Sequence, residues 1–224
     1  MNNSLENLKQ LIESFEFVAT DNPITDKIII HGVAGCGKST LTRELVKDSN
    51  FNVVNALSNE RFNLTGQYIK KEPIALENKI NVLDEYLSID NHEGFQVLLA
   101  DPFQYNQKPY LANYIKSKSH RFKKELVPIL SELGIEVEVE EEGLNIIKGS
   151  AYDIEPKGQI ICIEEEVAKY VAEHNLEVYH PCCVQGQEFE AVTFYHRKGL
   201  QEISRSDLYI ALTRVKTELR LLQL

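Results

Sequence analysis

One run of eight residues, Gly32 to Ser39, has the composition and spacing of a phosphate-binding loop, because it fits G-x-x-x-x-G-K-[ST]. In such a loop the glycines let backbone N–H groups surround phosphate oxygens. The lysine reaches the β and γ phosphates, and the serine hydroxyl holds Mg²⁺. The run follows an apolar stretch and precedes a helix-forming one, so a helix N-terminus adds partial positive charge. We therefore predict nucleotide binding, rather than a chance glycine-rich turn, by Gly32, Val33, Ala34, Gly35, Cys36, Gly37, Lys38, Ser39 and Thr40.

An acidic pair follows a second apolar stretch, in the run Asn81-Val-Leu-Asp84-Glu85. If that stretch is a buried strand, Asp84 emerges at the carboxyl edge of the sheet, where it can hold Mg²⁺ through its water shell. Glu85 is then placed to act as the base that activates water. The alternative is solvated loop charge, but the position after a strand and downstream of the phosphate-binding loop favours catalysis.

A third polar strand end is predicted at Asp101-Pro-Phe-Gln104, after the apolar run Leu98 to Ala100. A glutamine in this position can sense the γ-phosphate or orient the attacking water. An Asp-Pro turn that closes a strand explains the same residues equally well.

The elements that must position these residues are predicted from apolar runs and helical spacing. Strands are expected over residues 27–31, 52–56, 80–83 and 97–100, with helices over residues 5–15 and 39–46. A second series is expected to contain an apolar run over 111–115, a helix over 122–133, a half-exposed strand over 135–139 and a loop over 149–158. It continues with a strand over 159–163, a helix over 164–175, a strand over 191–196, a helix over 206–214 and a strand over 218–222.

This alternation predicts an α/β protein of two tandem RecA-like P-loop domains with mostly parallel sheets. The first domain is expected over residues 1–113 and the second over residues 114–224. The chain has 224 residues, of which 43% are hydrophobic, so it can bury a core. Its four cysteines are scattered or adjacent, a poor framework for disulfides, and the sequence contains no apolar run of the roughly 20 residues that a membrane span needs.

The formal net charge of −10 means that any nucleic-acid contact must come from a local patch. The densest basic cluster lies between residues 116 and 124, and Tyr110 and Tyr114 just before it could stack on bases. The RNA-binding residues expected from this region are Lys116, Lys118, Lys123 and Tyr114, although an ordinary solvated helix face explains single lysines as well. The acidic run over residues 136–142 would repel RNA. A zinc site at His180-Pro-Cys182-Cys183 is disfavoured because its ligands are adjacent, so we expect a buried structural segment there.

The ordered motifs of the chain resemble those of superfamily 1 RNA helicases of positive-strand RNA viruses. The matching runs are GVAGCGKST, VLDEY, LLADPFQ, SHRF, VQGQEFEAVTFY and LYIALTR, which span residues 32–214. With almost nothing outside this core, the chain resembles the first movement proteins of the triple gene block of potexviruses and carlaviruses. It lacks room for the inserted domains that grip a duplex in larger helicases, which argues against processive unwinding.

Carried over by motif, the resemblance implies that Arg121 and Arg214 are arginine fingers from the second domain. A guanidinium supplied in this way stabilises the charge that builds on the transferring phosphoryl group. The resemblance also implies that Gly186 and Glu188, in the fifth motif, bind the nucleotide, with the glutamate on the ribose. Arg214 at a helix end would in any case interact favourably with the helix dipole, and Glu188 could be plain surface.

The activity implied by the resemblance is RNA-dependent NTP hydrolysis or RNA unwinding, with ATP or another NTP as substrate and Mg²⁺ as cofactor, in plant viral cell-to-cell movement and silencing suppression. The implied partners are single-stranded viral RNA, other copies of the chain, other viral movement proteins, coat protein and the host silencing machinery. The implied location is the host cytoplasm, with plasmodesmata and the nucleus as further sites. An alternative is a nucleotide-switched RNA-binding scaffold with little unwinding activity. A small-molecule P-loop kinase would leave Arg214 and Glu188 without a role.

Overall fold

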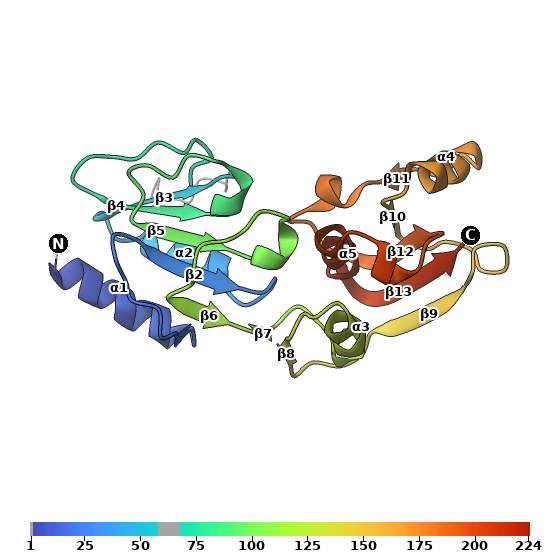
Figure 1. Ribbon diagram of the computed structural model, residues 1–224, viewed down its shortest axis with the longest axis horizontal. Helices are drawn as coiled ribbons and strands as arrows, with labels where there is room; N and C mark the ends of the chain where they lie inside the picture. Colours follow the sequence, from blue (N-terminus) through green and yellow to red (C-terminus); the bar gives the residue numbers. More distant parts are fainter. Residues whose placement is uncertain (1, 58–67) are drawn as a thin grey trace. The chain divides into compact units, whose positions relative to one another are not determined.

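The computed structural model describes residues 2–57 and 68–224, and it divides into two compact units, Met1–Lys118 and Ser119–Leu224 (Figure 1). Each unit is built on a mainly parallel β-sheet with helices, which confirms the α/β class with mostly parallel strands. The division lies five residues after the predicted one. The reason is that strand β6 (Tyr114–Lys116) pairs with β2 (Ile28–Gly32) and so completes the first sheet.

The sheet of the first unit has six strands in the order β1-β6-β2-β5-β4-β3. Its remaining strands are β1 (Val18–Ala19), β3 (Phe51–Asn55), β4 (Ile80–Asp84) and β5 (Val97–Ala100). Neighbouring strands are parallel except for the antiparallel pair β1 and β6. Strands β2, β4 and β5 are buried along their whole length, so their sequences are mainly apolar rather than alternating.

Two α-helices accompany this sheet. Helix α1 (Asn2–Ser14) buries Leu8 and Ile12, as its 3, 4 spacing predicts, and helix α2 (Lys38–Leu45) buries Leu41 and Leu45. Short 3₁₀ turns follow the ends of two central strands, η1 (Tyr86–Ser88) after β4 and η2 (Pro102–Gln104) after β5. These turns place polar residues at the carboxyl edge of the sheet.

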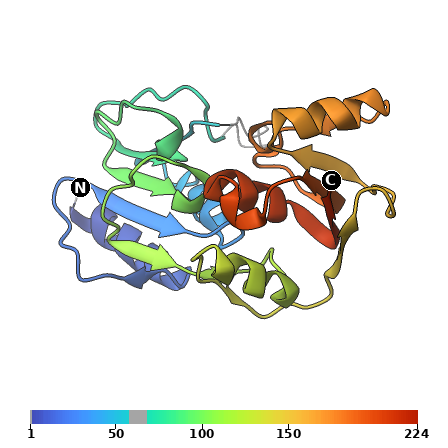
Figure 2. The ribbon, with the colours of Figure 1, turned by 45° about the vertical axis from the view of Figure 1, so that its right-hand side comes forward.

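The sheet of the second unit has five parallel strands in the order β11-β10-β12-β13-β9. They are β9 (Asn145–Ser150), β10 (Gln159–Cys162), β11 (Val178–Tyr179), β12 (Phe189–His196) and β13 (Val215–Gln223). Helix α4 (Glu165–Glu173) lies beside β10 and β11, and helix α5 (Arg205–Leu212) packs on β12 (Figure 2). The connections η4 (Pro181–Val184) and η5 (Leu200–Glu202) complete the unit.

Two sequence predictions in this half are corrected. The helix expected over residues 122–133 is a 3₁₀ turn, η3 (Lys124–Leu126), followed by the short helix α3 (Val127–Glu132). The strand expected over residues 135–139 is reduced to β8 (Glu138–Val139), which pairs with β7 (Lys118–Ser119). Strand β9 was not predicted, because it is a half-exposed edge strand with only two apolar residues. Among the described residues, no helix is long and apolar enough to cross a membrane.

Candidate nucleotide site

The phosphate-binding loop joins the end of β2 to the start of α2, as predicted. Gly35 has φ +77° and Gly37 has φ +103°, a left-handed conformation that side chains rarely adopt. A Cβ atom on Gly32 would lie 2.3 Å from Sγ of Cys36, so only glycine fits beside this thiol. Val33, Ala34 and Cys36 are buried, whereas Ser39 and Thr40 are exposed in the first turn of α2.

Lys38 is folded back onto its own loop. Its Nζ donates hydrogen bonds to the carbonyl oxygens of Gly32 at 2.7 Å and Val33 at 3.2 Å. The side chain is 7% exposed, so the loop itself supplies the partners of a buried ammonium group. A triphosphate would replace these carbonyl contacts with stronger, charge-assisted ones.

The acidic pair lies at the carboxyl end of β4. Asp84 is 2% exposed, and its Oδ2 accepts a hydrogen bond from Nδ2 of Asn55 at 2.9 Å. Glu85 has φ +58°, an uncommon conformation for a residue other than glycine, and its Oε2 accepts a bond from the Tyr105 hydroxyl at 2.9 Å. A strained residue held by a specific partner is frequent at functional sites.

The third strand end carries Asp101 and Gln104. Asp101 is fully buried, and its carboxylate accepts bonds from the backbone N–H of Phe103 at 3.2 Å and from Nε2 of Gln104 at 2.9 Å. This is the Asp-Pro turn that was one of the two interpretations of these residues from sequence. It also orients Gln104, so the structural and the functional interpretations of these residues are compatible.

The charges of these residues influence one another. Burial alone would lower the pKa of Lys38, but Cys36 and then Asp101, Glu85 and Asp84 raise it above its usual value. Because burial raises the pKa of the Cys36 thiol, that group is uncharged near neutral pH, and we attribute the effect on Lys38 to the three carboxyl groups. Burial, followed by repulsion from Asp84, raises the pKa of Glu85 to about 7.

The donor set fits a divalent metal bound together with a nucleotide. The three carboxyl groups of Asp84, Glu85 and Asp101 act on one buried ammonium, so the site carries an excess of negative charge. Within residues 2–57 and 68–224, no three His, Cys, Asp or Glu side chains are arranged to hold a metal by themselves. A metal here would therefore need phosphate and water oxygens as well as a protein carboxylate.

In the second unit, the structure brings together Arg121 and Glu188. Nε of Arg121 lies 2.6 Å from Oε1 of Glu188. The Ser119 hydroxyl accepts a bond from the backbone N–H of Arg121 at 3.1 Å, and the buried ring of Phe122 packs edge-on against Tyr209 of α5. The motif residues on either side of Arg121 thus fix its backbone against α5.

Arg214 follows the C-terminal end of α5 and is 1% exposed. Its Nε donates to the carbonyl oxygen of Ile210 at 3.1 Å, and its Nη2 donates to the Thr213 hydroxyl at 3.0 Å. The guanidinium therefore binds the helix end in the manner that the dipole argument anticipates. Gly186 has φ +81° in the turn between η4 and β12, which explains a glycine there.

The expected RNA-binding cluster is largely neutralised, and two of its residues are corrected. Tyr114 is 4% exposed within β6, so its ring is not available to stack on a base. Lys116 is buried, and its Nζ binds the Phe15 carbonyl at 2.8 Å and the Glu16 carboxylate at 3.2 Å. Lys123 is paired with Glu141 at 2.5 Å, and Lys124 with Glu142 at 2.6 Å. Lys118 is partly exposed in β7.

Sequence reasoning missed several supporting residues. Asn55 ends β3 directly opposite Asp84, so the strand-end rule could have found it. The contact of Tyr105 with Glu85 could not be predicted from sequence, because a loop brings the two side chains together. The contact of His31 was also not predicted. Its Nε2 lies 3.0 Å from the Tyr86 hydroxyl. The buried segment expected at His180–Cys183 is wrong for Cys182 and Cys183, which are exposed.

Solved structures share this fold at low sequence identity. The helicase nonstructural protein 10 of an arterivirus, solved in complex with DNA, has a TM-score of 0.63 and 13% identity over 88% of this chain and 60% of that one. The PRRSV helicase has a TM-score of 0.59 and 15% identity over 96% of this chain and 54% of that one. The chain therefore spans between half and two thirds of these helicases, and the likeness concerns the fold.

Sequence comparison is more specific. The family model of the viral superfamily 1 RNA helicase core domain matches residues 28–223. The movement and silencing protein TGBp1 of Apple stem pitting virus (isolate PA66) is 37% identical over 218 residues, covering 96% of this chain and 98% of the relative. The TGBp1 of Papaya mosaic potexvirus is 33% identical over 92% of this chain and 90% of the relative. The chain therefore belongs to the viral superfamily 1 RNA helicase family, together with the TGBp1 movement and silencing proteins.

Proposed function

We propose that the chain hydrolyses nucleoside triphosphates in an RNA-dependent manner, as a motor of the RNA-helicase kind. The observation that carries this proposal is the gathering of Lys38, Asp84, Glu85 and Gln104 at the carboxyl edge of one parallel sheet, with Asp101 orienting Gln104. Such an edge is where ligands bind in open α/β sheets. A small-molecule kinase would use the same loop but gives no role to the motif residues of the second unit.

Each residue of the first unit has a distinct role in this proposal. Lys38 binds the β and γ phosphates, and the loop residues Gly32 to Thr40 surround them with backbone N–H groups. Ser39 and Asp84 would hold Mg²⁺, which would neutralise charge on the phosphate oxygens. Glu85, with its raised pKa, accepts the proton of the attacking water, and Gln104 orients that water.

The second unit supplies the groups that complete hydrolysis. We treat both units as RecA-like domains, in which Arg121 and Arg214 stabilise the developing charge on the γ-phosphoryl group. Glu188, preceded by the turn at Gly186, accepts hydrogen bonds from the ribose hydroxyls. A guanidinium delivered from a second domain acts only when the domains close on the nucleotide, which would couple hydrolysis to movement along RNA.

By its relatives, the chain acts in cell-to-cell movement of plant viral RNA and in silencing suppression. Its partners in this proposal are single-stranded RNA, further copies of the chain, other viral movement proteins, coat protein and host silencing factors. It works in the host cytoplasm, at plasmodesmata and in the nucleus. The deciding experiment is steady-state NTP hydrolysis with and without single-stranded RNA. We expect RNA to stimulate the wild type, and Lys38→Ala to be inactive under both conditions. A wild-type protein without NTPase activity would refute the proposal.

A nucleotide-switched scaffold with little unwinding activity is the second candidate. This scaffold binds RNA without moving along it, so it needs fewer phosphate contacts than a motor does. The ion pairs Lys123–Glu141 and Lys124–Glu142 cancel much of the basic cluster expected to supply such contacts. The two candidates are separated by Lys38→Ala in a silencing-suppression assay. Retained suppression without hydrolysis supports the scaffold for that activity, and joint loss supports the motor.

A further inference from the structure

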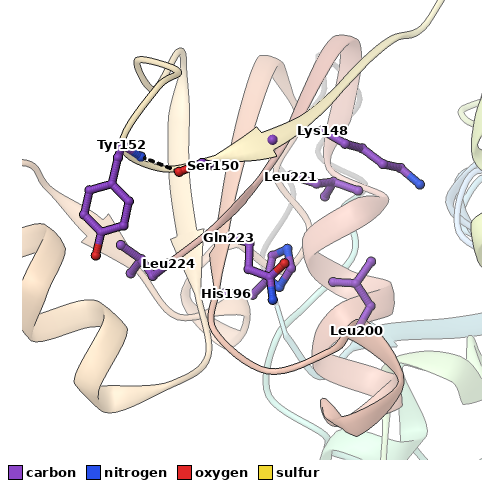
Figure 3. A pocket seen from close by; sticks show the side chains of 9 residues that line it. Lys148, Ser150, Tyr152, His196, Leu200, Leu221, Gln223 and Leu224 are labelled. Carbon is purple, nitrogen blue, oxygen red and sulfur yellow. Dashed lines mark hydrogen bonds between the residues drawn. The ribbon is translucent and has the colours of Figure 1, made fainter.

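The second unit contains a cavity of about 450 Å³ that none of the motifs uses. It lies at the carboxyl ends of the adjacent parallel strands β12, β13 and β9, next to η5 (Figure 3). The first unit places its phosphate-binding loop at the corresponding edge of its own sheet. This edge is the general ligand-binding position of open parallel sheets, and cavities of roughly 300 to 1,000 Å³ hold small ligands.

His196, at the end of β12, supplies a buried polar group to this cavity. Its side chain is 8% exposed, and its Nδ1 lies 2.9 Å from the carbonyl oxygen of Lys198. Because a carbonyl can only accept, Nδ1 carries the proton, and Nε2 of the neutral ring is an acceptor. Among the described residues, Nε2 of His196 has no hydrogen-bond partner. Every fully buried polar side-chain atom of the described residues does have a partner. The Nε2 atom is therefore accessible to solvent, and His196 is one of the residues that line the cavity.

The other polar groups of the lining are two donors that suit an anion, Lys148 and Ser150, and one acceptor, Gln223. Lys148 is exposed on β9 and forms no ion pair with the described residues. The Ser150 hydroxyl oxygen accepts a bond from the backbone N–H of Tyr152 at 3.1 Å, which leaves its hydrogen free to donate. Nε2 of Gln223 donates to the Arg197 carbonyl at 3.2 Å, which leaves the amide oxygen as an acceptor. Among the residues that the structure describes, no Asp or Glu side chain lines this cavity.

A neighbouring cavity of about 500 Å³ serves as an internal comparison. It shares Tyr152, but Asp153 and Glu155 line it, and no lysine or arginine does. The preference for an anion therefore belongs to the first cavity.

Apolar and aromatic side chains complete the first cavity. Leu200 and Leu221 form apolar parts of its wall, and the ring of Tyr152 is 72% exposed at its rim. The Tyr152 ring also packs edge-on against Tyr170, with 6.3 Å between the ring centroids. An exposed tyrosine ring can stack on a flat heterocycle.

We infer that this cavity binds a nucleotide with a terminal phosphate. The phosphate contacts the Ser150 hydroxyl and pairs with Lys148, whose side chain has to turn from its direction in Figure 3 toward the cavity. The base stacks on Tyr152, and an N–H group of the base donates to Nε2 of His196 or to the amide oxygen of Gln223. The ligand is a free mononucleotide or the phosphorylated end of an RNA strand, which share this chemistry. The site is separate from the phosphate-binding loop and does not depend on NTP hydrolysis.

The test is a titration of the full-length chain with UMP, followed by NMR or calorimetry. We expect Lys148→Gln and Tyr152→Ala each to weaken UMP binding at least tenfold. His196→Asn should do the same, because its amide keeps the donor to the Lys198 carbonyl but removes Nε2. Lys169→Gln, an exposed lysine on α4 outside the cavity, and Lys38→Ala should leave UMP binding within twofold of the wild type. Circular dichroism checks that each variant is folded.

Three results would overturn the inference. The first two are a wild-type chain that binds no UMP, and UMP binding that Lys38→Ala abolishes and the cavity variants retain. Equal affinity for UMP and inorganic phosphate would also contradict it, since the base would then contribute nothing. Competition by a 5′-phosphorylated oligouridylate, but not by its 5′-hydroxyl form, identifies an RNA end as the ligand. UMP binding without such competition identifies a free mononucleotide.

Discussion

Arg121 and Glu188 form an ion pair within the second unit, with 2.6 Å between Nε and Oε1. In the proposed function, Arg121 binds the γ-phosphoryl group and Glu188 binds the ribose. In the present arrangement the two side chains bind each other instead. A ribose that engages Glu188 would release Arg121 toward the phosphates. Both side chains are partly exposed, so the pair itself stabilises the fold by less than about 1 kcal/mol and is easily exchanged.

The first prediction concerns ribose recognition. Glu188→Ala should remove discrimination between an NTP and its 2′,3′-dideoxy analogue, because the carboxylate that accepts from the ribose hydroxyls is gone. A hydrogen bond to a charged group contributes about 1.5 to 3 kcal/mol, so wild-type discrimination should be about tenfold or more. Competition binding with the two nucleotides measures it. Glu190→Ala, which breaks only an exposed pair with Lys216, is the control. Unchanged discrimination in Glu188→Ala would exclude Glu188 from the ribose site.

The second prediction concerns the pH dependence of hydrolysis. Since burial and Asp84 raise the pKa of Glu85 to about 7, and a general base acts when deprotonated, kcat should rise with pH through about 7. Glu85→Gln should reduce kcat by about 10²-fold or more and remove this rise. Tyr105→Phe deletes the hydrogen bond that lowers the pKa of Glu85, so the midpoint should move to higher pH. A wild-type pH profile in Glu85→Gln would assign the rise to another group.

The third prediction concerns acid stability. Burial, followed by the charge of Lys38, lowers the pKa of His31 from 6.5 to about 4. Between these values the unfolded chain binds a proton that the folded chain does not, so the free energy of unfolding falls as the pH drops from about 6.5 to 4. His31→Gln, which retains a hydrogen-bonding group for Tyr86, should reduce this loss by up to about 3 kcal/mol. Urea unfolding at pH 7 and pH 4.5 tests this, with the exposed His174→Gln as control.

The fourth prediction concerns packing in the phosphate-binding loop. Gly32→Ala should destabilise the chain by about 1 to 3 kcal/mol and weaken nucleotide binding, because the new Cβ lies 2.3 Å from Sγ of Cys36. Cys36→Ala removes this sulfur, so the double variant should recover most of the loss. Thermal unfolding of the four proteins completes a double-mutant cycle. Simple additivity of the two substitutions would show that the clash is relieved elsewhere, for example at the Phe17 ring 3.2 Å away.

The fold was predictable from sequence where strands are buried on both faces. The apolar runs of β2, β4 and β5 have no other stable position than the centre of a sheet, and their bounds agree with prediction to within one residue. Strand β9 was missed because its stability comes from pairing with β13, and its own residues carry almost no apolar signal. The alternating run over residues 135–139 is mostly irregular, because only Glu138–Val139 pairs with another strand.

The candidate site was predictable to the same degree. The rule that polar residues follow parallel strands located Asp84, Glu85 and Gln104. The rule gave no information on which groups pair with them, because Tyr105 comes from a loop. The basic cluster illustrates the opposite failure, since Lys123 and Lys124 are neutralised by glutamates 18 residues later in the chain. A count of charges along the sequence cannot show such pairing.

The central claim is that the first unit binds the triphosphate and that guanidinium groups of the second unit complete its hydrolysis. Single-turnover phosphate release in the presence of single-stranded RNA, compared between the wild type and Arg214→Lys, tests it most directly. We predict a rate about 10³-fold lower in the variant, with nucleotide affinity within threefold of the wild type and an unchanged circular dichroism spectrum. A variant that releases phosphate at the wild-type rate would contradict the claim.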